Sequence, residues 1–396
     1  MSMQETMKIG IVCYPSIGGS GVVATELGKS LSRRGHQVHF FSYDLPQKLG
    51  EATEAFHFHH VDVPFYPLFR FPPYTLALAT AIYEVSKEVE LDILHVHYAV
   101  PHSTSAMLAK QMICSKSKKR LKVITTLHGT DTELVGQMPS YKPVVEFSLN
   151  GSNAVTTVSH HLKRVTEDQF DIDREVEVIY NPIDTQFFQP AQAEDRPDAE
   201  EKIITHISNF RPVKRVIDVV KIFDLISAVM PARLVLLGDG PDRHAVEEWV
   251  TRLGLNDRVE FHGSRLQVLE ALQKSDLLLC TSVNESFGLT VAEALACGVP
   301  AVASNVGGVP EVLTDGENGF LAPVGEIQQF AEKALQILTD PQLATRFREQ
   351  GRERIKQKFD SQKITRQYEE LYQRVIHSPD PECPSLAPSE QPFPAT

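Results

Sequence analysis

Residues 8–35 read KIGIVCYPSIGGSGVVATELGKSLSRRG, and this stretch decides the fold class. Its first part, residues 8–14, is a short apolar run of the kind that forms a buried strand. Glycines follow, and residues 22–34 then have the spacing of an amphipathic helix that Gly35 ends. A buried strand, a glycine-rich turn and a helix predict the first unit of a parallel α/β sheet.

The same alternation of apolar runs and helical stretches continues along the chain. We expect further strands at residues 37–42, 91–97, 123–127, 154–158 and 177–180. After a polar, acidic segment at 194–201 the pattern restarts, with strands at 203–207, 234–237, 259–261, 277–280 and 301–303. Continuous apolar strands indicate parallel sheets that are covered on both faces. The sequence therefore predicts two doubly wound, Rossmann-like α/β domains, with the ligand in an inter-domain cleft at the carboxyl ends of the strands.

These patterns also predict the domain boundaries. The N-terminal domain is expected to span residues 1–183 and the C-terminal domain residues 184–354. A charged helix at 355–377 is expected to cross back to the first domain. Residues 378–396 are rich in proline and hold almost no core material, so we expect a disordered tail.

Composition excludes several classes of protein. The chain has 396 residues, of which 42% are hydrophobic, and its 51 acidic and 39 basic residues give a net charge of −12. Such a chain is neither disordered nor a multi-span membrane protein, and a nucleic-acid binder would usually be basic. Most of the negative charge follows residue 183. The N-terminus does not have the pattern of a signal peptide, and the five cysteines form no CxxC pair, which favours a cytoplasmic protein with reduced thiols.

A glycine loop, Gly18-Gly-Ser-Gly21, lies between the first strand and the first helix. Without side chains the backbone can approach a ligand closely. Its N–H groups and the positive end of the helix suit a phosphate or a carboxylate. The spacing matches neither a dinucleotide fingerprint nor a P-loop, and a plain tight turn is the alternative.

A pair of carboxylates stands in the sequence ESFGLTVAE, from Glu285 to Glu293. If the helix begins near Phe287, Glu285 lies in the loop before it and Glu293 lies on the helix. The N–H groups of residues 287–290 would then face a diphosphate, and Glu293 could accept from two vicinal hydroxyls. The alternative is one capping carboxylate and one solvated carboxylate.

Cations and histidines follow other expected strands. Arg211, Lys214 and Arg215 come directly after the strand at 203–207, where they could neutralise a diphosphate or stabilise a leaving group. A solvated loop is the alternative reading. His128 and Thr130 end one strand of the first domain, and His97 and Tyr98 end another, so all four are expected at the domain edge.

The tract His57-Phe-His-His60 resembles a metal site, but no carboxylate or cysteine joins it at ligand spacing. We therefore expect no metal. The basic run at 116–122 is expected to be a solvated loop.

Together these motifs resemble the retaining family-four glycosyltransferases, which have the GT-B fold. The resemblance extends from Lys8 to about Ile376, and the E-x7-E element from Glu285 to Glu293 is its most specific part. Within that family, the stretches at residues 13–21, 92–98, 126–131 and 206–215 are most similar to enzymes of bacillithiol biosynthesis. This closer resemblance implies transfer of N-acetylglucosamine from UDP-N-acetylglucosamine to the hydroxyl of L-malate, with retention and without a metal or another cofactor. It also implies the first step of bacillithiol biosynthesis.

The resemblance also implies roles for individual residues. The catalytic residues would be His128, Lys214 and Glu285. The donor would be bound by Gly18, Gly19, Gly21, Asn209, Arg211, Lys214, Phe287, Gly288, Leu289, Thr290 and Glu293. The acceptor would be bound by Ser20, His97, Tyr98 and Thr130.

Several alternatives stay open. The acceptor could be an inositol phosphate or a lipid-linked group, or the chain could be a GT-B UDP-N-acetylglucosamine epimerase or a non-catalytic sugar-nucleotide binder. Asn209 stands where the family has an arginine, and the cation that would neutralise malate is not identified. No nucleic-acid partner and no stable membrane insertion are expected, and a homodimer is left open.

Overall fold

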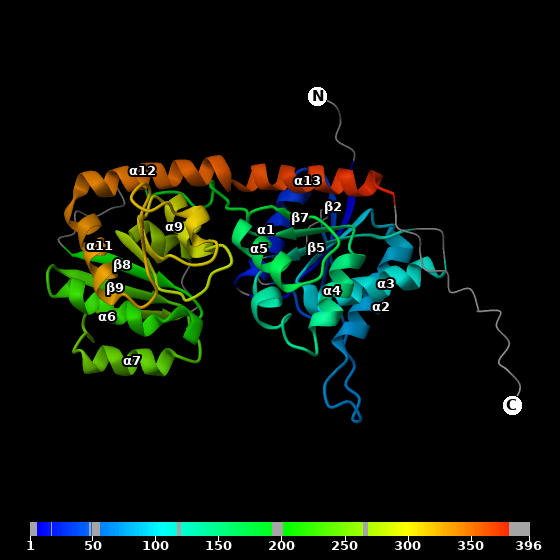
Figure 1. Ribbon diagram of the computed structural model, residues 1–396, viewed down its shortest axis with the longest axis horizontal. Helices are drawn as coiled ribbons and strands as arrows, with labels where there is room; N and C mark the ends of the chain where they lie inside the picture. Colours follow the sequence, from blue (N-terminus) through cyan, green and yellow to red (C-terminus); the bar gives the residue numbers. More distant parts are fainter. Residues whose placement is uncertain are drawn as a thin grey trace, which may run out of the picture. The chain divides into compact units, whose positions relative to one another are not determined.

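The computed structural model describes residues 6–16, 18–46, 49, 56–116, 120–191, 201–263 and 268–379. The predicted acidic segment and the predicted tail fall largely outside these residues. The chain forms two compact units (Figure 1). Unit 1 holds residues 1–157, 165–177 and 367–396, and unit 2 holds residues 158–164 and 178–366.

Unit 1 is built on a seven-stranded sheet with the order β3-β2-β1-β4-β5-β6-β7. Its strands are β1 (Lys8–Val12), β2 (Gln37–Ser42), β3 (Phe56–His60), β4 (Ile93–His97), β5 (Lys122–Leu127), β6 (Ala154–Thr157) and β7 (Val176–Val178). The pairs from β3 through β6 are parallel. A parallel sheet is buried on both faces, which explains why β4 and β5 are buried throughout.

Helices cover this sheet. They are α1 (Ser20–Arg33), α2 (Tyr74–Val89), α3 (Thr104–Cys114) and α4 (Lys142–Gly151), with short helical turns η1 (Ala99–Ser103) and η2 (Thr130–Leu134). Helix α5 (His160–Gln169) begins in unit 2 and ends in unit 1. One core cluster joins Leu78 and Ile82 of α2 to Leu94 and Val96 of β4. The apolar face of α2 therefore holds that helix against the sheet.

Unit 2 has a six-stranded parallel sheet with the order β10-β9-β8-β11-β12-β13. Its strands are β8 (Lys202–Ile207), β9 (Ala232–Leu237), β10 (Val259–Gly263), β11 (Leu277–Cys280), β12 (Ala301–Ser304) and β13 (Phe320–Ala322). Its helices are η4 (Pro212–Lys214), α6 (Val216–Ser227), α7 (Arg243–Arg252), α8 (Val268–Lys274), α9 (Leu289–Ala296), α10 (Val309–Val312), α11 (Ile327–Thr339) and α12 (Pro341–Lys358). Each sheet thus begins with the doubly wound order 3-2-1-4-5-6.

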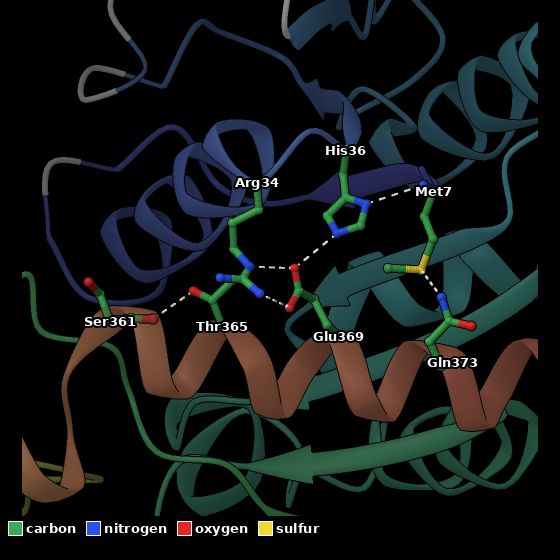
Figure 2. Close-up of polar contacts among 7 residues, drawn as sticks. All are labelled: Met7, Arg34, His36, Ser361, Thr365, Glu369 and Gln373. Carbon is green, nitrogen blue, oxygen red and sulfur yellow. Dashed lines mark hydrogen bonds and ion pairs between the residues drawn. The ribbon is translucent and has the colours of Figure 1, made fainter. Parts of the chain in front are cut away.

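The last helix, α13 (Ser361–His377), begins in unit 2 and continues in unit 1. In unit 1 it is held by Glu369, which is 2% exposed and binds two residues at the end of α1 (Figure 2). Arg34 donates from Nε and from its terminal nitrogen, at 2.5 and 2.7 Å. His36 Nε2 lies 3.0 Å from the same carboxylate, and its Nδ1 accepts from the N–H of Met7. This bidentate ion pair fixes the C-terminal helix on unit 1.

The two parallel α/β domains predicted from the sequence are confirmed, with some differences in the elements. The expected single charged helix near the C-terminus is two helices, α12 and α13, and neither α2 nor the edge strand β13 was predicted. Cys13, Cys280 and Cys297 are buried free thiols, as expected, but Cys114 is disulfide-bonded, so the expectation of reduced thiols throughout is wrong at that position. Among the described helices, none has both the length and the apolar character that a membrane span requires.

Candidate active-site residues in each unit

The glycine loop of unit 1 follows β1, beside the point where the strand order reverses between β1 and β4. Ligands of open α/β sheets bind at such switch points. Gly21 has no room for a side chain, because a Cβ there would lie 2.6 Å from the Tyr14 carbonyl oxygen. Helix α1 begins at Ser20, and no side chain caps its first turn. An uncapped helix start of this kind can receive an anion, and anion binding by Gly18, Gly19 and Gly21 stays a prediction.

Tyr98 follows β4 and lies at the same switch point. Its backbone has φ 92°, a conformation that L-residues rarely adopt and that costs about 1–3 kcal/mol. Its ring stacks on His128, with 5.9 Å between the centroids, and meets Tyr14 edge-on at 5.4 Å. The structure therefore brings together Tyr98 and His128, which the sequence placed on different strands.

His97 Nδ1 lies 2.9 Å from His128 Nε2, so the two rings share a hydrogen bond. His97 is fully buried, and its Nε2 finds no partner among the described residues. Burial lowers the pKa of His97 well below its usual value and that of His128 to about 3, so both rings are neutral near pH 7. Direct contact of His97 with an acceptor stays a prediction, and its observed position is that of a support for His128.

A second buried hydrogen-bond network connects strands β4, β5 and β6 with helix α13. His95 Nδ1 lies 2.7 Å from the Tyr372 hydroxyl of α13, and its Nε2 lies 2.6 Å from Thr126 Oγ1. Thr126 also bonds Thr156 on β6, at 2.6 Å. Since His95 has no exposed surface, it is a structural residue that joins three strands and the C-terminal helix.

Asp131 organises the loop after β5. Its Oδ1 accepts from the N–H groups of His128 and Gly129, at 3.0 and 2.9 Å, and its Oδ2 accepts from Ala99 N–H at 3.0 Å. Burial raises the pKa of Asp131 to about 6, although the three N–H groups oppose that shift. The carboxylate thus ties the loop that carries His128 to the one that follows Tyr98. Thr130, an expected acceptor residue, is exposed beside it.

In unit 2 the strand order reverses between β8 and β11, and the predicted cation and carboxylate meet there. Lys214 Nζ lies 2.5 Å from Glu285 Oε1, which also accepts from Ser282 Oγ at 2.8 Å. Thr281 Oγ1 donates to the Lys214 carbonyl at 3.0 Å. Burial works against the Lys214 ammonium, but the Glu285 carboxylate outweighs it, so the pKa of Lys214 is raised.

The carboxylate pair is placed as the sequence suggested. Glu285 lies in the loop, α9 begins at Leu289, and Glu293 lies within the helix at 7% exposure. Gly307 holds the loop, because it has φ 56° and a Cβ there would clash with the Glu285 carbonyl. Phe287 is 2% exposed, so its side chain is not available to a ligand. Gly288, Leu289 and Thr290 form the start of the helix.

The remaining predicted cations differ in their surroundings. Arg211 is exposed, as is Asn209. Arg215 Nε instead pairs with Asp218 at 2.5 Å, so part of its charge is already neutralised. Lys214 is paired in the same way with Glu285, so the net positive charge of these three cations comes mainly from Arg211.

The sequence analysis did not identify three residues that fix the loops of unit 2, namely Gly238, Gly240 and Glu311. Gly238 and Gly240 pack against the backbone of Ser208 and Phe210, and the sequence GDG after β9 is a turn signal that could have indicated this. Glu311 accepts from the N–H groups of His160 and His161, at 2.9 and 2.8 Å, and so caps α5.

The histidine tract of β3 is not arranged as a metal site. His59 Nε2 lies 2.8 Å from His39 Nδ1, and His57 stacks on His39. Among the described residues, no three histidine, cysteine, aspartate or glutamate side chains form a group that could hold a metal ion.

Comparison with known proteins agrees with this arrangement. Residues 17–187 match the family described as Glycosyltransferase Family 4, and residues 188–354 match Glycosyl transferases group 1. The N-acetyl-alpha-D-glucosaminyl L-malate synthase of Bacillus anthracis is 45% identical over 93% of this chain and 97% of its own. A glycosyltransferase of Methanocaldococcus jannaschii is 25% identical over 91% of this chain and 97% of its own.

Solved structures share the fold. A glycosyltransferase from Rickettsia africae superposes with a TM-score of 0.79 at 21% identity, covering 95% of this chain and all of the other. Anabaena Alr3699/HepE, solved with UDP and glucose, has a TM-score of 0.77 at 21% identity, covering 93% and 99%. The neighbours have the GT-B fold, and with the sequence matches they show that this chain is an enzyme of the family-four glycosyltransferases.

Proposed function

We propose that this enzyme transfers N-acetylglucosamine from UDP-N-acetylglucosamine to the hydroxyl of L-malate, with retention, as the first step of bacillithiol biosynthesis in the cytoplasm. The observation that carries the proposal is the 45% identity over 93% of the chain to a protein named for that product. More distant relatives have other acceptors in their names, including the D-inositol 3-phosphate glycosyltransferase of Mycolicibacterium smegmatis, which matches only 41% of this chain.

In this proposal unit 2 binds the donor. Glu293 accepts from the ribose hydroxyls, and the start of α9 and Lys214 receive the diphosphate. The part-buried ion pair with Glu285 supports this role, because it keeps Lys214 protonated. A charged ammonium there would stabilise the departing UDP.

Unit 1 would bind malate. The uncapped start of α1 suits one carboxylate of the acceptor, and Tyr98 and Thr130 would contact the rest. His128 is neutral near pH 7, so its part would be a hydrogen bond to the transferred sugar and not a charge. We further propose that neither a metal nor another cofactor is needed, because Lys214, Arg211 and two helix starts supply the positive charge.

An acceptor screen tests the proposal. The purified chain is incubated with UDP-N-acetylglucosamine and L-malate, D-malate, inositol phosphate or no acceptor, and products are identified by mass and anomeric configuration. We expect an α-linked N-acetylglucosaminyl malate with L-malate. A product with inositol phosphate alone, or an epimerised donor without acceptor, would overturn the proposal. Activity that EDTA abolishes and a divalent cation restores would contradict the metal-free mechanism.

A further inference from the structure

Two histidines at the carboxyl end of the unit 1 sheet are joined by a hydrogen bond from ring to ring. His97 is the last residue of β4, His128 directly follows β5, and His97 Nδ1 lies 2.9 Å from His128 Nε2. Such a bond needs one N–H and one bare nitrogen, so one histidine donates and the other accepts. The direction of the bond decides what the second nitrogen of each ring can do.

Both rings are neutral near pH 7, so each carries a single N–H. Burial lowers the pKa of His97 well below its usual value and that of His128 to about 3. The histidines beside them are neutral for the same reason, since burial lowers the pKa of His95 to about 3 and that of His102 to about 4. A neutral imidazole holds its proton on Nδ1 or on Nε2. The pair can therefore be arranged in two ways.

The surroundings of His97 distinguish the two arrangements. Its side chain is fully buried, and its Nε2 has no hydrogen-bond partner among the described residues. If His97 accepted from His128, its own proton would be on Nε2, and a buried N–H would be left without an acceptor. If His97 donates, Nε2 keeps only a lone pair. A buried N–H without a partner is the rarer case in proteins, so His97 Nδ1–H is the donor and His128 Nε2 the acceptor.

This direction places the proton of His128 on Nδ1. That nitrogen bonds none of the described residues, and His128 is only partly buried, so a ligand can reach it. The ring is held in place, because Tyr98 stacks on it at 5.9 Å and Asp131 accepts from its backbone N–H at 3.0 Å. His128 therefore presents a fixed N–H donor at the edge of the sheet.

We propose that His97 is a positioning residue that sets the tautomer of His128, so that His128 Nδ1–H donates a hydrogen bond to an oxygen of a bound substrate. An N–H donor suits a hydroxyl or phosphate oxygen. A nitrogen that already holds a proton cannot take the proton of the acceptor hydroxyl, so His128 is not the base through this atom. The inference rests on the proposed function only for the substrate that His128 meets. It gives His97 a role through His128 and not by contact with the acceptor.

The tautomer is measured on the unaltered full chain without any substrate. Long-range proton–nitrogen correlation spectra of the chain with isotope-labelled histidine distinguish a protonated ring nitrogen from a bare one, and His128→Gln identifies the His128 signals. We expect His128 at pH 7.5 to carry its proton on Nδ1 and to have a bare Nε2. A proton on Nε2, or on both nitrogens, would overturn the proposal.

Kinetics test what the tautomer does for activity. His97→Leu removes the donor and should lower kcat about tenfold. His97→Asn should retain most of the activity, because its amide places an N–H near the position of Nδ1. In the background of His128→Gln, His97→Leu should cause little further loss, because its effect passes through His128.

His39→Leu is the matched control. His39 is another buried histidine of unit 1, its Nδ1 lies 2.8 Å from a ring nitrogen of His59, and its Nε2 has no partner among the described residues. His39→Leu therefore removes the same kind of contact away from His128 and should leave kcat unchanged. Circular dichroism checks that all variants are folded.

Three kinetic results would contradict the positioning role: equal losses of kcat in His97→Leu and His39→Leu, equal losses in His97→Leu and His97→Asn, or independent effects of His97→Leu and His128→Gln. The two measurements also separate this inference from the proposed function. If L-malate gives no product but the spectrum shows the proton on His128 Nδ1, the proposed function fails and the tautomer is confirmed. A proton on Nε2 in a chain that does form the malate product would overturn the tautomer alone.

Discussion

Lys214 Nζ lies 2.5 Å from Glu285 Oε1 at the carboxyl edge of the unit 2 sheet, and both side chains are mostly buried. The Glu285 carboxylate therefore stabilises the charge of Lys214 against burial, and the pKa of Lys214 is raised. Removing one partner of such a pair leaves the other charge buried and uncompensated, which costs more than the pair itself contributes. Single substitutions here are expected to affect both stability and catalysis, so the two effects must be measured separately.

Lys214→Ala should lower kcat/KM by a factor equivalent to about 2–4 kcal/mol, because the leaving phosphate loses its cation. Lys214→Arg should retain part of the activity, since it keeps the charge. A double-mutant cycle with Glu285→Gln separates the ion pair from the effect on chemistry. Steady-state rates with both substrates give these values, and Lys214→Ala with a near-normal rate would rule out the leaving-group role.

Glu293→Gln should weaken UDP binding by at least about tenfold, because a charged acceptor of two ribose hydroxyls becomes a neutral amide. Calorimetry with UDP measures this without any acceptor. Glu349→Gln is the matched control, since Glu349 is an exposed carboxylate of the same unit. Unchanged UDP affinity in the Glu293 variant would contradict the ribose contact.

The sequence predicted the frame of the fold well, because apolar runs and glycine turns are local signals. The strand β8 with its cations and the strand β11 with the E-x7-E element were both recognised in this way. The doubly wound order then brings their carboxyl ends together. The edge strand β13 has only three residues, between Gly319 and Pro323, and it was missed, whereas the equally short β7 was predicted from the run at 177–180.

Contacts between distant residues could not be predicted. Lys214 and Glu285 are 71 residues apart, and Arg34 and Glu369 are 335 apart, so no spacing rule relates them. His97 was expected at the edge of the domain, which it reaches, but its burial depends on how His128 and Tyr98 pack over it. Side-chain packing of this kind is decided by tertiary structure and not by local pattern.

The protein should lose stability below about pH 6.5. Burial lowers the pKa of His95 and His128 to about 3 and that of His102 to about 4. The unfolded chain protonates all three near pH 6.5, so their stabilising contribution is present above that pH and is lost as the pH falls toward 3–4. Each histidine contributes a slope of about 1.4 kcal/mol per pH unit below the unfolded pKa.

Denaturant unfolding at pH 7.5 and 5.5 checks this expectation. The free energy of unfolding should be lower at pH 5.5, and His95→Gln should reduce the difference. His244→Gln is the control, because His244 has a side chain that is 85% exposed, and it should leave the difference unchanged. Equal stability at the two pH values would contradict the neutral, buried state of these rings.

Asp131 should act as a positioning residue for the acceptor side. Its two carboxylate oxygens accept from three N–H groups, whereas an asparagine has one oxygen and would turn an NH₂ group toward one of the donors. Asp131→Asn should therefore lower kcat/KM for L-malate about tenfold. UDP affinity should stay unchanged, because Asp131 belongs to unit 1.

The pH dependence distinguishes this role from a merely structural one. Burial raises the pKa of Asp131 to about 6, so its proton is bound more tightly in the folded protein. Its contribution to stability is therefore greatest below the unfolded value near 3.8 and is lost as the pH rises through 6, opposite in sign to that of the histidines.

For activity the carboxylate of Asp131 is the competent form, because protonation removes one of its acceptor sites. The kcat/KM for malate should thus fall as the pH drops below about 6. This acidic limb of the pH profile should be absent in Asp131→Asn. It should be kept in Asp44→Asn, the control, because Asp44 is an exposed carboxylate of the same unit. An unaltered acid limb in Asp131→Asn would show that another group governs it.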